Sequence, residues 1–332
     1  MPEMQFLHGG KTIEFCFYIC SLAPMSYWSS NITENEIHSV TLERGVWSDP
    51  DRHDRQVPYK IYIPQGVSGK MPIIIWSHGL GGSRDGAGFI SRYIASYGYI
   101  IVHIQHKGSD SGLWEGKPGH PWDVIRNTHI PRRATLQRLL DVPFALDELQ
   151  KMDLLQADFS KMGMSGHSFG AMTTQTMAGQ RRGMGKRLYD LFEPRFKAAI
   201  AYSPVVVYKK GNHAPEDFYG GIRIPTFFMT GTEDSSPVTG ASYLDRLEAF
   251  YHSGGPEQHL LILEDGDHMV YNGSRGKLGD NPNREMHEKI IKLSSLAFWE
   301  AYLKDDQSAK DWLTGTGFQN WLGADGEYKF KA

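Results

Sequence analysis

Cysteine is nearly absent from this sequence, whose 332 residues contain only two, Cys16 and Cys20. A disulfide framework or a cysteine-based zinc site is therefore excluded from everything that follows them. The formal net charge of −3 gives no reason to expect nucleic acid or an anionic membrane as a partner. No run of about 18 apolar residues occurs, which argues against a transmembrane helix and stable membrane insertion. The remaining composition, 40% hydrophobic and 22% charged, is that of an ordinary globular protein.

The first 35 residues are ambiguous. Residues 15–23 (FCFYICSLA) form an apolar stretch that could be the core of a short signal peptide. However, Glu14 adjoins the stretch and Lys11 is the only positive charge before it, whereas a secretory signal has a basic start and a longer apolar run. We interpret residues 1–35 as a leader, either disordered or a weak signal segment, and residues 36–332 as one domain. We predict a cytoplasmic protein, or a secreted one if residues 15–23 belong to a signal peptide.

The hydrophobic pattern predicts an α/β fold. Residues 38–47 and 57–64 are typical of an antiparallel strand pair. Short and nearly continuous apolar runs follow, as expected for strands covered by helices on both faces, at 72–77, 99–104, 161–166, 197–202, 225–230 and 259–264. Helical stretches fill the gaps between these runs. The order predicts a mostly parallel, doubly wound sheet of about eight strands with an antiparallel edge.

Two helices and two insertions can be placed in this scheme. An amphipathic stripe predicts a late helix through Met286, Ile290, Leu293, Ala297 and Ala301. Leucines between 136 and 149 predict another helix, which Pro143 should kink or divide in two. The longest irregular insertions, near 105–130 and 205–224, are expected at the carboxyl ends of strands, where ligands bind.

The sequence GHSFG places Ser168 in a Gly-x-Ser-x-Gly pattern. Composition alone gives about 0.3 such patterns in a chain of this kind, so the pattern is weak evidence by itself. Its context is more informative, because a strand precedes it and helix-forming residues follow it, as a nucleophilic serine on a strained turn requires. Gly166 and Gly170 stand where a β-carbon would collide with the tight backbone. We therefore predict that Ser168 is a nucleophile.

A serine nucleophile needs a base and an orienting carboxylate, which in such folds follow in the order Ser, Asp or Glu, His. Asp234 and His268 each come just after an apolar run, so the sheet should deliver both to the edge that carries Ser168. Glu233 is the nearest competitor for the acid, and Asp265 and Asp267 are more typical of a turn. The competing histidines are His103, His106, His167 and His213.

The remaining requirement is a pair of backbone N–H groups for the developing oxyanion. Phe169, directly after the nucleophile, should supply one. The glycine-rich loop at 77–86 (SHGLGGSRDG) should supply the other from Leu80, and His78 is interpreted as structural. A phosphate or dinucleotide site is not indicated, because neither Gly-Lys-Ser/Thr nor Gly-x-Gly-x-x-Gly occurs in this loop. Aromatic residues of the insertions either line a substrate wall or only pack loops onto the body: Trp114, Trp122, Phe218 and Tyr219.

Taken together, the segments IIIWSHGLGGSRDG, MGMSGHSFGAMTTQTMAGQ, IPTFFMTGTEDSSP and EDGDHMVY resemble the motif series of the α/β-hydrolase superfamily. Within it they are most similar to the predicted-dienelactone-hydrolase branch that includes platelet-activating factor acetylhydrolases, across residues 57–302. The resemblance implies the α/β-hydrolase fold, with Ser168, Asp234 and His268 as triad and Leu80 and Phe169 as oxyanion donors. Dienelactone hydrolases proper use a cysteine nucleophile, so the serine here favours ordinary ester hydrolysis.

We therefore predict a serine carboxylic-ester hydrolase that acts on small or short-acyl esters through an acyl-enzyme. Its partner is a small-molecule ester, and the chemistry needs neither a metal nor an organic cofactor. Acetylhydrolase, lipase-like, polyester or phthalate-ester hydrolysis on the same triad is the alternative. A non-catalytic ligand-binding α/β-hydrolase is a further one. The sequence leaves the oligomeric state open.

Overall fold

The computed structural model describes residues 28, 33, 35–154, 156–184, 187–207, 213–273 and 281–332. The predicted leader at 1–35 lies outside the described residues apart from positions 28, 33 and 35, and so does the stretch 208–212 of the second insertion. In the described parts of the chain we find no helix whose length and hydrophobicity would let it span a bilayer.

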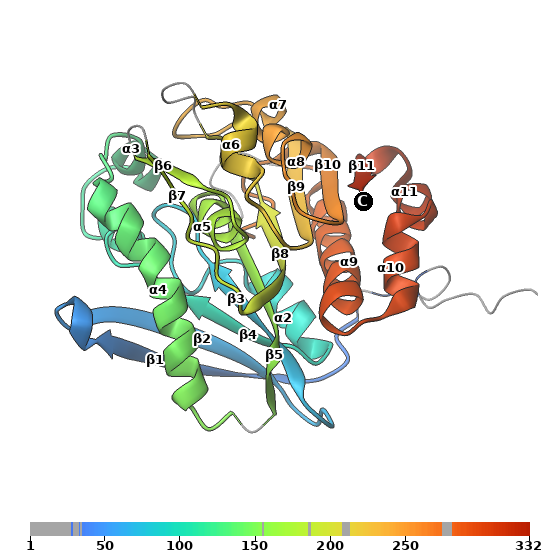
Figure 1. Ribbon diagram of the computed structural model, residues 1–332, viewed down its shortest axis with the longest axis horizontal. Coiled ribbons are helices and arrows are strands. Elements are labelled where there is room, and N and C mark those ends of the chain that lie inside the picture. The colour runs from blue at the N-terminus through green and yellow to red at the C-terminus, as the bar shows by residue number, and fades with distance from the viewer. Residues whose placement is uncertain are drawn as a thin grey trace, which may run out of the picture.

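A nine-stranded sheet forms the centre of the described structure, in the order β1-β2-β4-β3-β5-β8-β9-β10-β11 (Figure 1). The inner strands from β4 to β10 run parallel, whereas β1 with β2, β2 with β4, and β10 with β11 pair antiparallel. The bounds are β1 Val40–Asp49, β2 Arg55–Pro64, β3 Met71–Ser77, β4 Ile100–Ile104, β5 Ala157–His167, β8 Phe196–Tyr202, β9 Thr226–Glu233, β10 Gln258–Asp267 and β11 Gly326–Lys331. A separate hairpin joins β6 (Arg182–Met184) to β7 (Arg187–Tyr189).

Helices cover both faces of this sheet. One face carries α2 (Gly88–Ser96), α9 (Arg284–Leu303), α10 (Gln307–Thr314) and α11 (Gly317–Leu322). The other carries α4 (Arg132–Lys151), α5 (Phe169–Met177), α6 (Pro215–Tyr219) and α8 (Glu248–Tyr251). The short elements are α3 (Pro121–Arg126), α7 (Tyr243–Arg246), η1 (Pro50–Arg52), η2 (Ser111–Leu113) and η3 (Gly323–Asp325).

Strand β8 shows why the inner strands are apolar throughout. Its side chains alternate between two hydrophobic clusters, with Ala198, Ile200 and Tyr202 facing α9 and Ala199 and Ala201 facing the opposite helices. Because helices cover both faces, positions 198–202 are all buried and apolar, and only Lys197 near the start of the strand is exposed. The predicted α/β-hydrolase fold is confirmed.

The structure decides two details that the sequence left open. The leucine-rich stretch is the single helix α4, with Pro143 inside it rather than between two helices. Burial of Val142, Leu146 and Leu149 against the sheet offsets the backbone hydrogen bond that proline removes, a loss of about 3 kcal/mol. The sheet also has one strand more than expected, because β11 adds an antiparallel edge beside β10.

Candidate active site

Ser168 stands on the sharp turn between β5 and α5. Its backbone angles, φ 56° and ψ −116°, lie in a region that non-glycine residues rarely adopt. The flanking glycines make the turn possible: a β-carbon on Gly166 would lie 2.6 Å from the Ser77 carbonyl oxygen, and one on Gly170 would collide with the same oxygen. The structure therefore has the strand–turn–helix geometry expected for an exposed nucleophile.

The parallel sheet brings Ser168, Asp234 and His268 together. Asp234 follows β9 and His268 follows β10, at the same edge as the end of β5. His268 Nε2 lies 3.0 Å from Ser168 Oγ, and His268 Nδ1 lies 2.7 Å from Asp234 Oδ1. Because a carboxylate can only accept, Nδ1 carries the proton and the Nε2 lone pair faces the serine. This arrangement can remove the hydroxyl proton during nucleophilic attack.

The Asp234 carboxylate is fully buried and held by more than the imidazole. Ser203 Oγ and Thr230 Oγ1 each donate to it at 2.9 Å, and Arg246 Nη2 pairs with it at 3.2 Å. Burial by itself would raise the pKa of Asp234, but the charge of Arg246, with the hydrogen bonds from His268 and Ser203, holds it below its usual value. The carboxylate is therefore ionised at neutral pH.

Ser203 and Arg246 are site residues that the sequence reasoning missed. Ser203 directly follows β8 with φ 57°, and its Oγ lies 2.9 Å from both Asp234 Oδ1 and His268 Nδ1. Arg246, at the end of α7, also donates to the backbone carbonyls of Asp234 at 2.9 Å and Pro204 at 2.7 Å. For Ser203, the one sequence signal for a site residue was its position after an apolar strand. Arg246 gave no such signal, because an arginine in a polar segment is ordinarily exposed.

In the described structure none of the competing acids and histidines has a hydrogen bond to Ser168 Oγ, although His167 also lines the cavity. Glu233 is exposed, and Asp267 caps its own turn by accepting from the Met269 backbone N–H at 2.7 Å. His167 Nε2 lies 2.7 Å from the His268 carbonyl oxygen and therefore holds the backbone of that loop. His213 faces Asp217 at 3.6 Å.

Two peptide planes present free N–H groups near Ser168. We call residues 77–86 the oxyanion loop. In it the Gly79 carbonyl accepts from Gly82 N–H at 3.1 Å and from His78 Nδ1 at 2.6 Å, so in a trans peptide the Leu80 N–H points the opposite way. The Ser168 carbonyl accepts from Met172 N–H at 3.1 Å, which turns the Phe169 N–H outward in the same manner. Neither N–H donates to another described residue, so both can receive an oxyanion.

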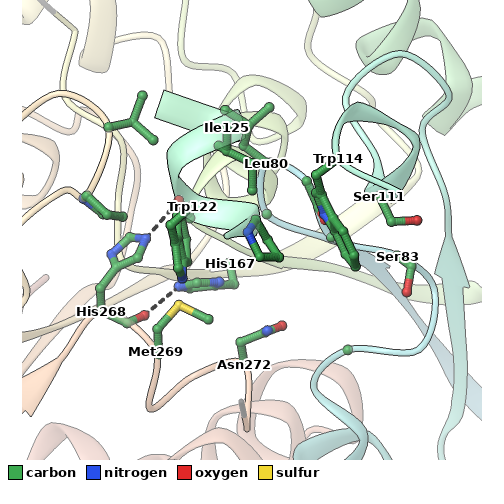
Figure 2. A pocket seen from close by; sticks show the side chains of 18 of the residues that line it. Leu80, Ser83, Ser111, Trp114, Trp122, Ile125, His167, His268, Met269 and Asn272 are labelled. Carbon is green, nitrogen blue, oxygen red and sulfur yellow. Dashed lines mark hydrogen bonds between the residues drawn. The ribbon is translucent and has the colours of Figure 1, made fainter. Parts of the chain in front are cut away.

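A cavity of about 260 Å³ opens at Ser168 and His268 (Figure 2). The oxyanion loop forms one wall, Trp114, Trp122 and Ile125 form another, and Val238 and Met269 lie on the loops that carry the acid and the base. The predicted aromatic wall therefore exists for Trp114 and Trp122. Phe218 and Tyr219 were also expected in a substrate wall, and for them this prediction is wrong. Both side chains are at most 2% exposed and belong to the hydrophobic core, and neither lines the cavity.

Comparison with known proteins finds sequence similarity to one group of hydrolases. Residues 56–114 match the family model of platelet-activating factor acetylhydrolase, isoform II. The platelet-activating factor acetylhydrolase of Cavia porcellus is 25% identical over 297 residues, which cover 77% of this chain and 63% of that protein. The chain is similar to platelet-activating factor acetylhydrolases. A putative phospholipase A2 of Schizosaccharomyces pombe is 25% identical over 181 residues, 41% of either chain. The resemblance inferred from the motifs is thus confirmed, although the chain spans less than two thirds of these relatives.

The stretch matched to the acetylhydrolase model runs from β2 through the oxyanion loop to Trp114. Within it, the 105–130 insertion is fastened to the oxyanion loop. Trp114 Nε1 donates to the Gly81 carbonyl at 2.7 Å, Gly81 N–H donates to the Ser109 carbonyl at 2.9 Å, and Ser111 N–H donates to the Gly82 carbonyl at 2.8 Å. We call these three bonds the clasp. They join one wall of the cavity to the loop that carries the Leu80 N–H.

Proposed function

We propose that this chain is a serine hydrolase of small or short-acyl carboxylic esters. The observation that carries the proposal is the continuous hydrogen-bond series from Asp234 through His268 to Ser168, which opens on a cavity that Leu80 also lines. The similarity to acetylhydrolases supports ester hydrolysis as the reaction class.

The geometry accounts for each step of such a reaction. Ser168 Oγ attacks the ester carbonyl while His268 Nε2 takes its proton, and Asp234 stabilises the resulting imidazolium. The N–H groups of Leu80 and Phe169 bind the oxyanion, each supplying about 2.7–4 kcal/mol of transition-state stabilisation. His268 then protonates the leaving alcohol. Water, deprotonated by the same histidine, attacks the acyl-enzyme and releases the acid.

The size and the lining of the cavity favour a small and uncharged substrate. Its volume of about 260 Å³ is below the roughly 300–1,000 Å³ of pockets that enclose drug-sized ligands. The described residues that line it include no lysine or arginine, so an anionic group of the substrate would gain no ion pair there.

A chain-length series of p-nitrophenyl esters, from acetate to octanoate, tests the proposal. We expect kcat/KM to be highest for the shortest esters, and Ser168→Ala to lose at least about 10⁴-fold in kcat. A fluorophosphonate should label the wild-type protein once, at Ser168. The matched control is Ser160→Ala, an exposed serine at the far end of β5, which should keep full activity. Activity that survives in Ser168→Ala would refute the proposed nucleophile.

An acetyl ester of a phospholipid is a second candidate substrate, favoured by the names of the relatives. Such a lipid would place its short acetyl group in the cavity and leave its long chains outside. Release of acetate from a lipid with an acetyl group at its central glycerol carbon, compared with p-nitrophenyl acetate, distinguishes the two. Turnover of the lipid at less than about one hundredth of the kcat/KM of the aryl ester would count against it.

A further inference from the structure

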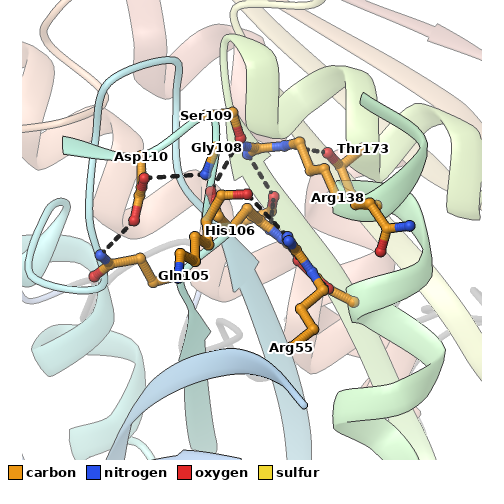
Figure 3. A network of polar contacts seen from close by, with 12 residues as sticks. Arg55, Gln105, His106, Gly108, Ser109, Asp110, Arg138 and Thr173 are labelled. Carbon is orange, nitrogen blue, oxygen red and sulfur yellow. Dashed lines mark hydrogen bonds and ion pairs between the residues drawn. The ribbon is translucent and has the colours of Figure 1, made fainter. Parts of the chain in front are cut away.

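Arg138 is an arginine of α4 whose side chain is completely buried beneath the candidate site (Figure 3). Its guanidinium reaches three segments of the fold. Nη2 donates to the His78 carbonyl and, at 2.8 Å, to Ser77 Oγ; Nη1 donates to Ser109 Oγ at 3.0 Å. Nε donates to Thr173 Oγ1 at 2.8 Å.

These acceptors are all uncharged. Among the described residues no carboxylate forms an ion pair with Arg138, and the charges of Asp141 and Asp110 act on it only from a distance. Burial lowers the pKa of Arg138 to about 9, so the group is still protonated at neutral pH. A buried charge without a paired carboxylate contributes poorly to stability, and an apolar side chain would ordinarily be the better choice for the fold alone. The residue therefore calls for an explanation other than stability.

The contacts of Arg138 connect both halves of the oxyanion hole. His78 directly precedes the Gly79–Leu80 peptide, whose N–H is one donor. Thr173 lies one helical turn beyond Phe169, whose N–H is the other, and the guanidinium carbon lies 4.8 Å from the centre of the Phe169 ring. One rigid, planar group thus sets the distance between the oxyanion loop and the first turn of α5.

A second Ser–His–Asp series contacts the Arg138 guanidinium through Ser77 Oγ. Ser77 Oγ lies 2.9 Å from His106 Nε2, and His106 Nδ1 lies 3.1 Å from Asp141 Oδ2. All three side chains are fully buried and none lines the cavity, so this series cannot meet a substrate. Arg52 and Arg55 hold the carboxylate at 2.8 and 2.7 Å.

The proton positions in this series are fixed by its ends. The Asp141 carboxylate makes His106 Nδ1 a donor, which leaves His106 Nε2 to accept from Ser77 Oγ and leaves that oxygen to accept from Arg138. The His106 backbone N–H donates to His78 Nε2 at 3.0 Å, so the proton of the His78 ring is on Nδ1 and points at the Gly79 carbonyl. The hydrogen bonds thus run from Asp141 through His106 and His78 to the Gly79 carbonyl, which belongs to the same peptide as the Leu80 N–H.

We propose that Arg138 is a positioning residue for the oxyanion hole, which fixes the Gly79–Leu80 peptide against the first turn of α5 so that both N–H groups converge on one oxygen. The inference rests on the proposed ester hydrolysis. It implies that the loss of Arg138 impairs the transition state far more than it impairs substrate binding.

The test compares Arg138→Met and Arg138→Lys with wild type, after the active sites have been counted by fluorophosphonate titration. We measure kcat and KM for p-nitrophenyl acetate and the inhibition constant of an aryl trifluoromethyl ketone, whose adduct with Ser168 places an oxyanion in the hole. Arg138→Met should lower kcat per titrated site about 100-fold and weaken the ketone by a similar factor, with KM changed less than about threefold. Arg138→Lys should recover part of both losses. Arg195→Met, which removes a partly buried arginine paired with Glu193 and Asp147, is the matched control and should leave both values unchanged.

An Arg138→Met variant that is less stable but has wild-type kcat and ketone affinity per titrated site would overturn the proposal. If that variant does not fold, Thr173→Val and Ser109→Ala each remove one acceptor of the guanidinium, and each should lower kcat about tenfold with KM unchanged; wild-type values in both would also overturn it. The proposed function is tested separately. If wild type hydrolyses the ester and Ser168→Ala does not, the proposed function stands, whichever result the Arg138 variants give. A wild-type protein without esterase activity would overturn both.

Discussion

Acidification from pH 7 to pH 5 should strongly destabilise this protein, because it buries histidines in their neutral form. Burial lowers the pKa of His103, His167 and His259 to about 3 and that of His106 to about 4, and it holds the pKa of His78 well below its usual range. Below about pH 6.5 the unfolded chain binds a proton at each of these positions, whereas the folded chain does not. Stability therefore rises with pH between the folded values and 6.5, and it is lost as the pH falls through that window.

The magnitude follows from the size of that window. Each of the four histidines whose folded pKa is about 3 or 4 loses about 2 kcal/mol of stabilisation between pH 7 and pH 5, and the four together lose about 7 kcal/mol. A folded protein is ordinarily stable by about 5–15 kcal/mol, so most of that stability disappears within these two pH units. Near pH 5.5 these four histidines should make the free energy of unfolding change by about 5 kcal/mol per pH unit, equivalent to between three and four protons taken up.

Urea titrations followed by tryptophan fluorescence, at a series of pH values from 5.5 to 7.5, measure this slope. The matched variant is His259→Gln, in which an amide that does not titrate replaces a ring held between the hydroxyls of Tyr302 and Tyr328. Its slope should be lower by about 1.4 kcal/mol per pH unit, one proton fewer. A wild-type slope below about 2 kcal/mol per pH unit would refute the reasoning, since the buried rings would then be charged in the folded protein.

Three substitutions near the site give further expectations. Ser203→Ala removes a hydroxyl that contacts both Asp234 and His268, and should lower kcat about 10- to 100-fold with KM unchanged in steady-state assays; equal loss in KM would contradict a role at the triad. Arg246→Met leaves the Asp234 charge without its buried partner and should destabilise the fold by about 3–5 kcal/mol in urea; a loss below about 1 kcal/mol would contradict the pairing. Trp122→Ala should raise the octanoate-to-acetate ratio of kcat/KM at least about tenfold, and an unchanged ratio would remove this residue from the substrate wall.

The inner strands and the triad were predictable because their signals are local. A strand covered on both faces has to be apolar throughout, and the residue that follows such a strand in a parallel sheet has to lie at the carboxyl edge. These two rules are sufficient to bring Ser168, Asp234 and His268 together. Strand β11 lacked the signal, because its lysines alternate with aromatic residues at a half-buried edge and resemble a polar surface segment.

The supporting residues were not predictable for a different reason. Arg138 and Arg246 are buried, although arginine is among the residues least often found inside, and nothing in their neighbours along the chain indicates it. Their acceptors are backbone carbonyls and hydroxyls contributed by distant segments, and only the folded structure brings these together. Phe218 and Tyr219 illustrate the opposite error: they lie in an insertion at the ligand-binding edge, but a short helix turns them into the core.

The clasp between the 105–130 insertion and the oxyanion loop limits how the specificity of this protein can be altered. A change at Trp114 would widen the cavity and at the same time release the Gly81 carbonyl, so that acyl preference and turnover would change together. Trp122 lines the same cavity from α3, and its side chain has no hydrogen bond to the oxyanion loop in the described structure. Libraries that seek activity on larger esters should therefore vary Trp122 first and keep Trp114.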